Sequence, residues 1–169
     1  MFRVGAVITL VVLCSGFAGA VVKAQEPALD RDFLLKAAPQ CHALMEYAQL
    51  AEKRSSNVEV KAFARKLVQE HKKLHEELAQ AAKNQKLAVA SGTERSTRDE
   101  LTRLGKQEGA AFDRAFLKDV IQDHEKAIQC CEAQAKRGKD ARLEQFAKDA
   151  LPHLKEHLKE ARNLADKIK

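Results

Sequence analysis

Three histidines stand on the apolar faces of three different predicted helices: His71, His124 and His157. Around each of them, apolar residues recur in alternating steps of three and four, which is the pattern of a helix face turned toward a bundle core. Side chains at one level of a four-helix bundle converge, and bundle metal sites are built in this way. Because imidazole binds zinc, copper and iron, the sequence allows a transition-metal site at this level.

Other residues that can bind a metal surround these three histidines. Four of them lie next to one of the three, or one helical turn away from it: His75, His153, Glu70 and Asp123. The His-x3-His spacing places both rings of each pair on one face of a helix. The three core-facing histidines are therefore the main candidate ligands, and these four residues are additional candidates.

Two other interpretations of the histidines stay open. A histidine on an apolar face is more often a core residue with one hydrogen-bonding neighbour than a metal ligand. Buried histidines can also make packing sensitive to acid, because imidazole ionises at about pH 6.5. A ferritin-type di-iron centre is not expected, because its Glu-x-x-His pairs are missing: Lys72 and Leu154 stand three residues before His75 and His157.

Three cysteines follow the first 24 residues: Cys41, Cys130 and Cys131. An exported protein tends to oxidise cysteines that can meet, but adjacent cysteines in one helix cannot easily bridge each other. The sequence therefore predicts a disulfide between Cys41 and Cys130 on opposed helices. The alternative is that the cysteines are small core residues, and no Cys-x-x-Cys redox motif is present.

The helices that position these residues come from an internal repeat of 83 positions. Residues 30–34 (DRDFL) match residues 113–117 (DRAFL) without a gap, and Phe63-Ala64 matches Phe146-Ala147. Each half has the apolar spacing of two long helices. The repeat predicts an all-α four-helix bundle made of two similar helical hairpins.

The predicted helices cover residues 30–54, 57–87, 110–137 and 140 to near the chain end. Asp30 is the candidate N-cap of the first helix, Ser56 and Glu59 fit a capping box for the second, and Asn57 and Asp140 are cap residues one repeat apart. The stretch between the hairpins contains a short helix that starts near residue 97. A connection of this length can run back along the bundle, as in ferritin-like folds.

The N-terminal pattern predicts a signal peptide over residues 1–24. The remaining residues, 25–169, are expected to form one four-helix domain. Arg3 precedes an uncharged run that ends in small residues, and we expect cleavage after Ala24. The alternative is an uncleaved membrane anchor; otherwise no transmembrane span is expected. Interleaved charges and only 5% aromatic residues argue against nucleic-acid binding.

Five sequence blocks resemble one known family. They are KAFA at 61–64, VQEH at 68–71, FDR at 112–114, QDH at 122–124 and LPHLKEHL at 151–158. Together they are similar to domain-of-unknown-function family 4142, a group of exported bacterial proteins often labelled as outer-membrane proteins. The resemblance implies a ferritin-like helical fold and an extracytoplasmic location, and it also matches Glu46 to a glutamate of the family's first helix. It supplies no activity.

The sequence thus favours a periplasmic or secreted, non-enzymatic helical bundle that acts as a binding or stress-related module. The sequence identifies no partner; an envelope component and a second copy of the chain are the candidates. The alternative function is metal binding through the core-facing histidines. Hydrolytic and phosphate-binding motifs such as Gly-x-Ser-x-Gly do not occur.

Overall fold

The computed structural model describes residues 28–89 and 93–168, and the predicted signal peptide lies outside these residues. The described chain forms five helices: α1 (Ala28–Arg54), α2 (Val58–Asn84), α3 (Arg95–Gly105), α4 (Gly109–Arg137) and α5 (Ala141–Lys167). No helix within the described ranges is long and apolar enough to cross a bilayer.

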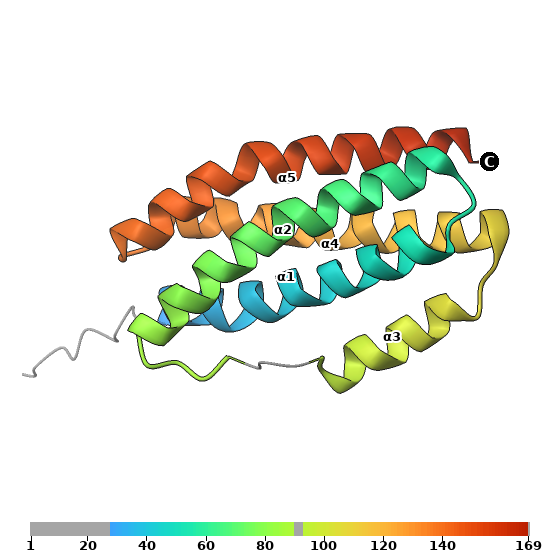
Figure 1. Cartoon of the computed structure of the whole chain (residues 1–169). Coiled ribbons are helices and arrows are strands. Elements are labelled where there is room, and N and C mark those ends of the chain that lie inside the picture. The colour runs from blue at the N-terminus through green and yellow to red at the C-terminus, as the bar shows by residue number, and fades with distance from the viewer. Residues whose placement is uncertain (1–27, 90–92, 169) are drawn as a thin grey trace, which may run out of the picture.

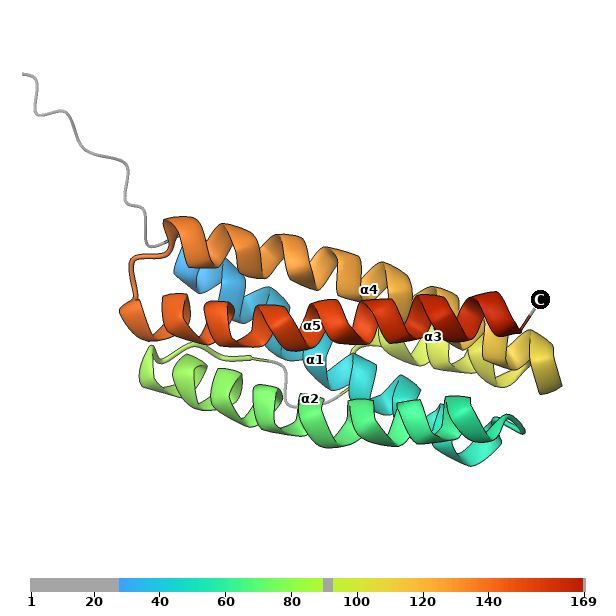
Figure 2. The same cartoon turned by 90° about the horizontal axis from the view of Figure 1, so that it is seen from above.

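The four long helices form the predicted bundle. The most extensive contacts are within the hairpins α1–α2 and α4–α5, and contacts of α1 with α4 and of α2 with α5 join the hairpins. The connection from α2 runs back along the bundle and carries α3 before α4 begins (Figures 1 and 2). This long crossover gives the ferritin-like arrangement expected from the repeat.

The crossover is anchored on the outer side of α1. Glu46 accepts a hydrogen bond of 2.5 Å from the Thr93 hydroxyl, and the Tyr47 hydroxyl donates to Glu100 of α3. Glu46 therefore contacts the crossover rather than the bundle interior.

The helix ends follow the repeat. Asn57 accepts from the backbone N–H groups of Glu59 and Val60, and Asp140 accepts from that of Arg142, so both predicted caps are confirmed. The capping box at Ser56 is wrong, because Asn57 takes its place. The second helix also ends at Asn84 rather than near residue 87, because the next residues leave helical geometry.

Asp30 lies inside the first turn of α1 and does not cap it, which corrects the prediction. Its buried carboxylate accepts hydrogen bonds from Gln134 Nε2 at 2.6 Å and from the N–H groups of Lys139 and Asp140. Position 138 requires glycine, because a Cβ there would lie 2.3 Å from Gln134 Nε2. Asp30 thus ties the start of the first hairpin to the turn of the second. Pro39 lies inside the continuous α1.

The core has two apolar halves along the bundle axis. One half contains Phe63 and Leu67 of α2 with Phe116 and Val120 of α4, and the other contains Phe33, Leu78, Ile128 and Leu154 among its members. Each long helix passes from one half to the other near its middle. At this level the core-facing side chains of α2, α4 and α5 are histidines.

Candidate metal centre

His71 from α2, His124 from α4 and His157 from α5 meet between the two apolar halves of the core. Their exposed fractions are 4%, 1% and 0%, and one ring nitrogen of each lies within 4.8 Å of the others. The ring centroids are 5.3–5.5 Å apart. We call these three residues the histidine cluster. The sequence placed them on three helices, and the structure brings them to one level.

Hydrogen bonds fix which nitrogen carries the proton in two of the rings. His124 Nδ1 lies 2.9 Å from the Val120 carbonyl oxygen, and His157 Nε2 lies 3.0 Å from a carboxylate oxygen of Glu70. Both oxygens accept, so both of these nitrogens donate. A neutral imidazole has only one N–H, so His124 Nε2 and His157 Nδ1 carry lone pairs. These two nitrogens are 3.3 Å apart and point at each other.

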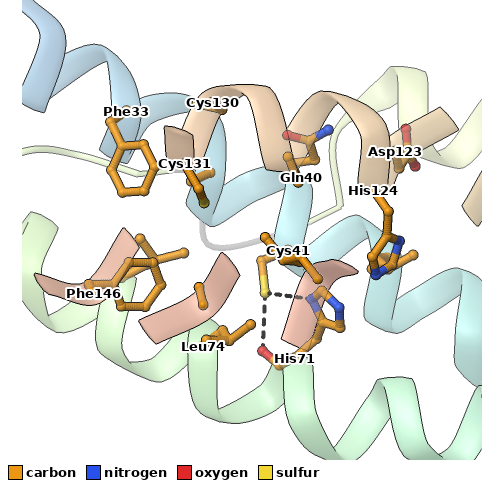
Figure 3. A pocket seen from close by; sticks show the side chains of 16 residues that line it. Phe33, Gln40, Cys41, His71, Leu74, Asp123, His124, Cys130, Cys131 and Phe146 are labelled. Carbon is orange, nitrogen blue, oxygen red and sulfur yellow. Dashed lines mark hydrogen bonds between the residues drawn. The ribbon is translucent and has the colours of Figure 1, made fainter. Parts of the chain in front are cut away.

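The contacts of the third ring, His71, also indicate which of its nitrogens carries the proton. The Cys41 thiol from α1 donates to the His71 backbone carbonyl at 3.1 Å, and the Cys41 sulfur lies 3.4 Å from His71 Nδ1 (Figure 3). With the thiol proton used in this way, Nδ1–H faces the sulfur and Nε2 carries the lone pair. His71 Nε2 is buried and has no hydrogen-bond partner among the described residues.

Burial keeps all three rings neutral. Burial lowers the pKa of His124 to about 4, lowers the pKa of His71 well below its usual range, and lowers that of His157 against the opposing effect of Glu70. Each ring also disfavours a charge on its neighbours. The cluster is therefore three uncharged donors whose lone pairs converge, which is the form in which imidazole binds metals.

The four outer candidates separate into different roles. Glu70 fixes the orientation of His157, as carboxylates do for metal-binding histidines, rather than joining the cluster. His153 is largely exposed and lies 3.7 Å from the same carboxylate. His75 Nδ1 bonds to the Ala38 carbonyl at 3.1 Å, away from the cluster. Asp123 pairs with Lys126 at 3.6 Å on the side of α4 that faces α3.

The predicted Cys41–Cys130 disulfide is not formed, and the three cysteines of the described chain are free. The Cys41 thiol points toward His71. Cys130, on α4, is only half buried. Burial raises the pKa values of the Cys41 and Cys131 thiols to about 12, so both are protonated.

Sequence reasoning missed the contact between Cys41 and His71. A signal for it was present, because the 83-residue shift places Cys41 on His124. Equivalent positions of the two hairpins reach the same level of a two-fold bundle. The first helix therefore contributes a thiol at the level where the other three long helices contribute imidazoles.

The separations in the cluster fit a transition-metal ion. Metal–imidazole bonds of about 2.0–2.1 Å hold ligand nitrogens roughly 3.3–3.6 Å apart. His124 Nε2 and His157 Nδ1 are already 3.3 Å apart, and one ring nitrogen of each of the three histidines lies within 4.8 Å of one in each of the others. Glu70 supplies the hydrogen-bonded carboxylate that commonly supports such a ligand.

Solved structures with a similar fold include metal-bound proteins. CopM in its Cu(II)-bound form aligns with a TM-score of 0.71 and 16% identity over 83% of this chain and 97% of CopM. Its Cu(I)-bound form aligns with a TM-score of 0.70 and 16% identity over 82% and 96% of the two chains. A DUF305 protein from Streptomyces coelicolor, described as a "putative secreted protein", has a TM-score of 0.71 and 13% identity over 83% and 93%. At these identities the likeness concerns the fold alone.

The family comparison agrees with the resemblance seen in the sequence blocks. Among curated proteins, none matches this chain. The family model DUF4142, described as a domain of unknown function, matches residues 18–164. Because this match covers most of the sequence, the chain belongs to the DUF4142 family.

Proposed function

We propose that this protein is an exported helical bundle that binds a monovalent copper ion at the histidine cluster, and that its role is binding rather than catalysis. The convergence of three unprotonated nitrogens carries the proposal. Two lone pairs 3.3 Å apart repel each other, and a buried nitrogen without a partner costs about 1–3 kcal/mol. A cation shared by the three rings removes both penalties.

The charges around the cluster favour a monovalent over a divalent ion. The three rings are neutral, and the carboxylate in contact with them is Glu70. One positive charge and Glu70 together leave the buried site neutral, whereas a divalent ion leaves one positive charge uncompensated. The cost of burying charge rises with its square, so the divalent ion is penalised more. Copper(I) combines a single charge with affinity for imidazole.

Two further observations support the proposal. CopM, which shares this fold, has been solved with Cu(I) and with Cu(II) bound. For the location, the N-terminal residues 1–24 have the charge and apolar pattern of a signal peptide, and the fold neighbour from Streptomyces coelicolor is described as secreted. These two observations support a periplasmic or extracellular location for the mature protein, which is part of the proposal.

A competition titration tests the proposal. Purified mature protein competes for Cu(I) with a coloured chelator such as bathocuproine disulfonate, and Zn²⁺ affinity is measured in parallel. We expect one high-affinity Cu(I) ion per chain. His71→Ala, His124→Ala and His157→Ala should each weaken Cu(I) binding by more than about 100-fold, beyond the range for supporting residues.

His42→Gln is the matched control for these variants. His42 is partly exposed, packs against the His75 ring at 5.3 Å between ring centroids and lies outside the cluster. This variant should keep the wild-type affinity, and thermal melts verify that every variant is folded. Undiminished Cu(I) binding by the three cluster variants would refute the proposed site.

A further inference from the structure

A cavity of about 50 Å³ adjoins the histidine cluster. His71 and His124 form part of its wall, and Cys41, Cys130 and Cys131 line it as well. In the view of Figure 3, the Cys41 side chain lies next to the His71 ring, and Phe33, Cys131 and Phe146 lie on the other side of it. The cavity therefore adjoins the cluster on the side of Cys41.

An open groove between α1, α3 and α4 lies on the other side of three residues of the cavity wall. The groove measures about 680 Å³, and it shares Gln40, Asp123 and Cys130 with the cavity. All three shared residues have polar or sulfur-bearing side chains, and Cys130 is half buried. The boundary between groove and cavity is therefore built from groups that can contact a cation.

The groove has a small excess of negative charge. Its charged lining residues are the acidic Glu94, Glu100 and Asp123 and the basic Lys36 and Lys126. Glu100 accepts from Tyr47, and Asp123 lies 3.6 Å from Lys126. Carboxylates in a recess raise the local concentration of cations.

A second groove approaches the cavity from the opposite side, between α2 and α5. It measures about 400 Å³ and has acidic lining residues of its own, including Glu77 and Asp149. The residues that it shares with the cavity are Leu74, Phe146 and Ala150, all apolar. Glu70 and His153 also line this groove, but the Glu70 carboxylate is hydrogen-bonded to the N–H edge of His157, which turns no lone pair toward the groove. An ion that enters there loses hydration at the apolar wall of the cavity, or meets the N–H edge of His157, without gaining a ligand from the cluster.

We propose that a copper(I) ion reaches the histidine cluster through the α1–α3–α4 groove, by passing between the side chains of Gln40, Asp123 and Cys130 that separate the groove from the cavity. This path rests on the proposed function. It leads past the Cys41 thiol to the unpartnered Nε2 of His71. The thiols along it favour soft ions such as copper(I) over hard ones such as magnesium.

Alkylation of Cys130 tests the path. Cys130 is the least buried of the three cysteines, so brief treatment with N-ethylmaleimide should yield a single adduct between the groove and the cavity, verified by mass spectrometry. Stopped-flow absorbance then follows Cu(I) transfer from its coloured bicinchoninate complex, and the end point gives the affinity. We expect the adduct to slow uptake by about tenfold or more, with the end-point affinity changed less than about threefold.

The control carries the same adduct in the other groove. In a protein with Cys130→Ser and Asp149→Cys, alkylation blocks the α2–α5 side and should leave the uptake rate within about twofold of the same protein before alkylation. Equal uptake by alkylated and untreated wild-type protein would overturn the path while leaving the proposed function intact. Slower uptake only in the control would also overturn it. A wild-type end point without Cu(I) binding would refute the proposed function and the path together.

Discussion

Replacing Glu70 with Gln isolates the contribution of one negative charge to the proposed copper site. The Glu70 carboxylate accepts from His157 Nε2 at 3.0 Å, and a glutamine carbonyl can accept the same hydrogen bond. The orientation and tautomer of His157 are therefore kept, with its lone pair still facing His124. The substitution removes only the charge that offsets a bound cation.

The expected loss follows from distance and exposure. The carboxylate and a cation on the far side of the imidazole are about 7 Å apart, and at an effective dielectric constant of about 20 such charges interact by about 2 kcal/mol. This corresponds to a loss of Cu(I) affinity of about 30-fold. The Glu70 side chain is one-third exposed, so solvent screening reduces the loss toward about tenfold.

The assay is a Cu(I) competition titration of wild-type and Glu70→Gln protein at low and at high salt. Glu77→Gln is the control, because it removes the same charge from the same helix two turns farther along. The control should bind Cu(I) like the wild type. An affinity of Glu70→Gln within about threefold of wild type, or an equal loss in the control, would refute the reasoning.

Three further predictions concern the protein without metal. Burial lowers the pKa of His124 from 6.5 in the unfolded chain to about 4 in the folded protein. Between these two pH values the unfolded chain binds a proton at His124 that the folded protein does not bind. The free energy of unfolding is therefore undiminished above about pH 6.5 and falls by about 3 kcal/mol toward pH 4. Equal melting temperatures at pH 5 and pH 8 would contradict this. Asp30→Ala removes the carboxylate that accepts from Gln134 and from the turn before α5, and it should cost about 3 kcal/mol, or roughly 6–12 °C in melting temperature. An unchanged melting temperature would count against this link between the hairpins. Thiol titration of the native protein should modify Cys130 first and reach Cys41 and Cys131 only on unfolding, and fewer than three thiols in denaturant would indicate a disulfide.

The fold could be predicted from the sequence because the repeat and the helix periods agree. The 83-residue shift indicated two hairpins, and the caps at Asn57 and Asp140 marked the same point in each. The long stretch between them indicated the crossover. Helix ends were less predictable, since Asp30 looks like a cap in sequence but accepts hydrogen bonds from the far hairpin instead.

The candidate site could be predicted only in part. Apolar spacing placed the three cluster histidines on inward faces, but their common level depends on how far the helices slide along one another, which spacing does not determine. Glu70 lies next to His71 in sequence and yet contacts His157, because adjacent residues point in different directions from a helix. The Cys41–Cys130 disulfide predicted from the sequence is not formed for the same reason. The directions of the two cysteine side chains depend on how each helix is rotated about its axis, which the sequence does not determine.

X-ray absorption spectroscopy of the copper(I)-loaded mature protein tests the central claim most directly. The convergence of three imidazole lone pairs predicts a first shell of nitrogen donors at about 2.0 Å, imidazole outer-shell scattering and no sulfur donor. The His124→Ala protein should lose this spectrum. A wild-type first shell made of sulfur would place copper on the thiols of the cavity and contradict the account.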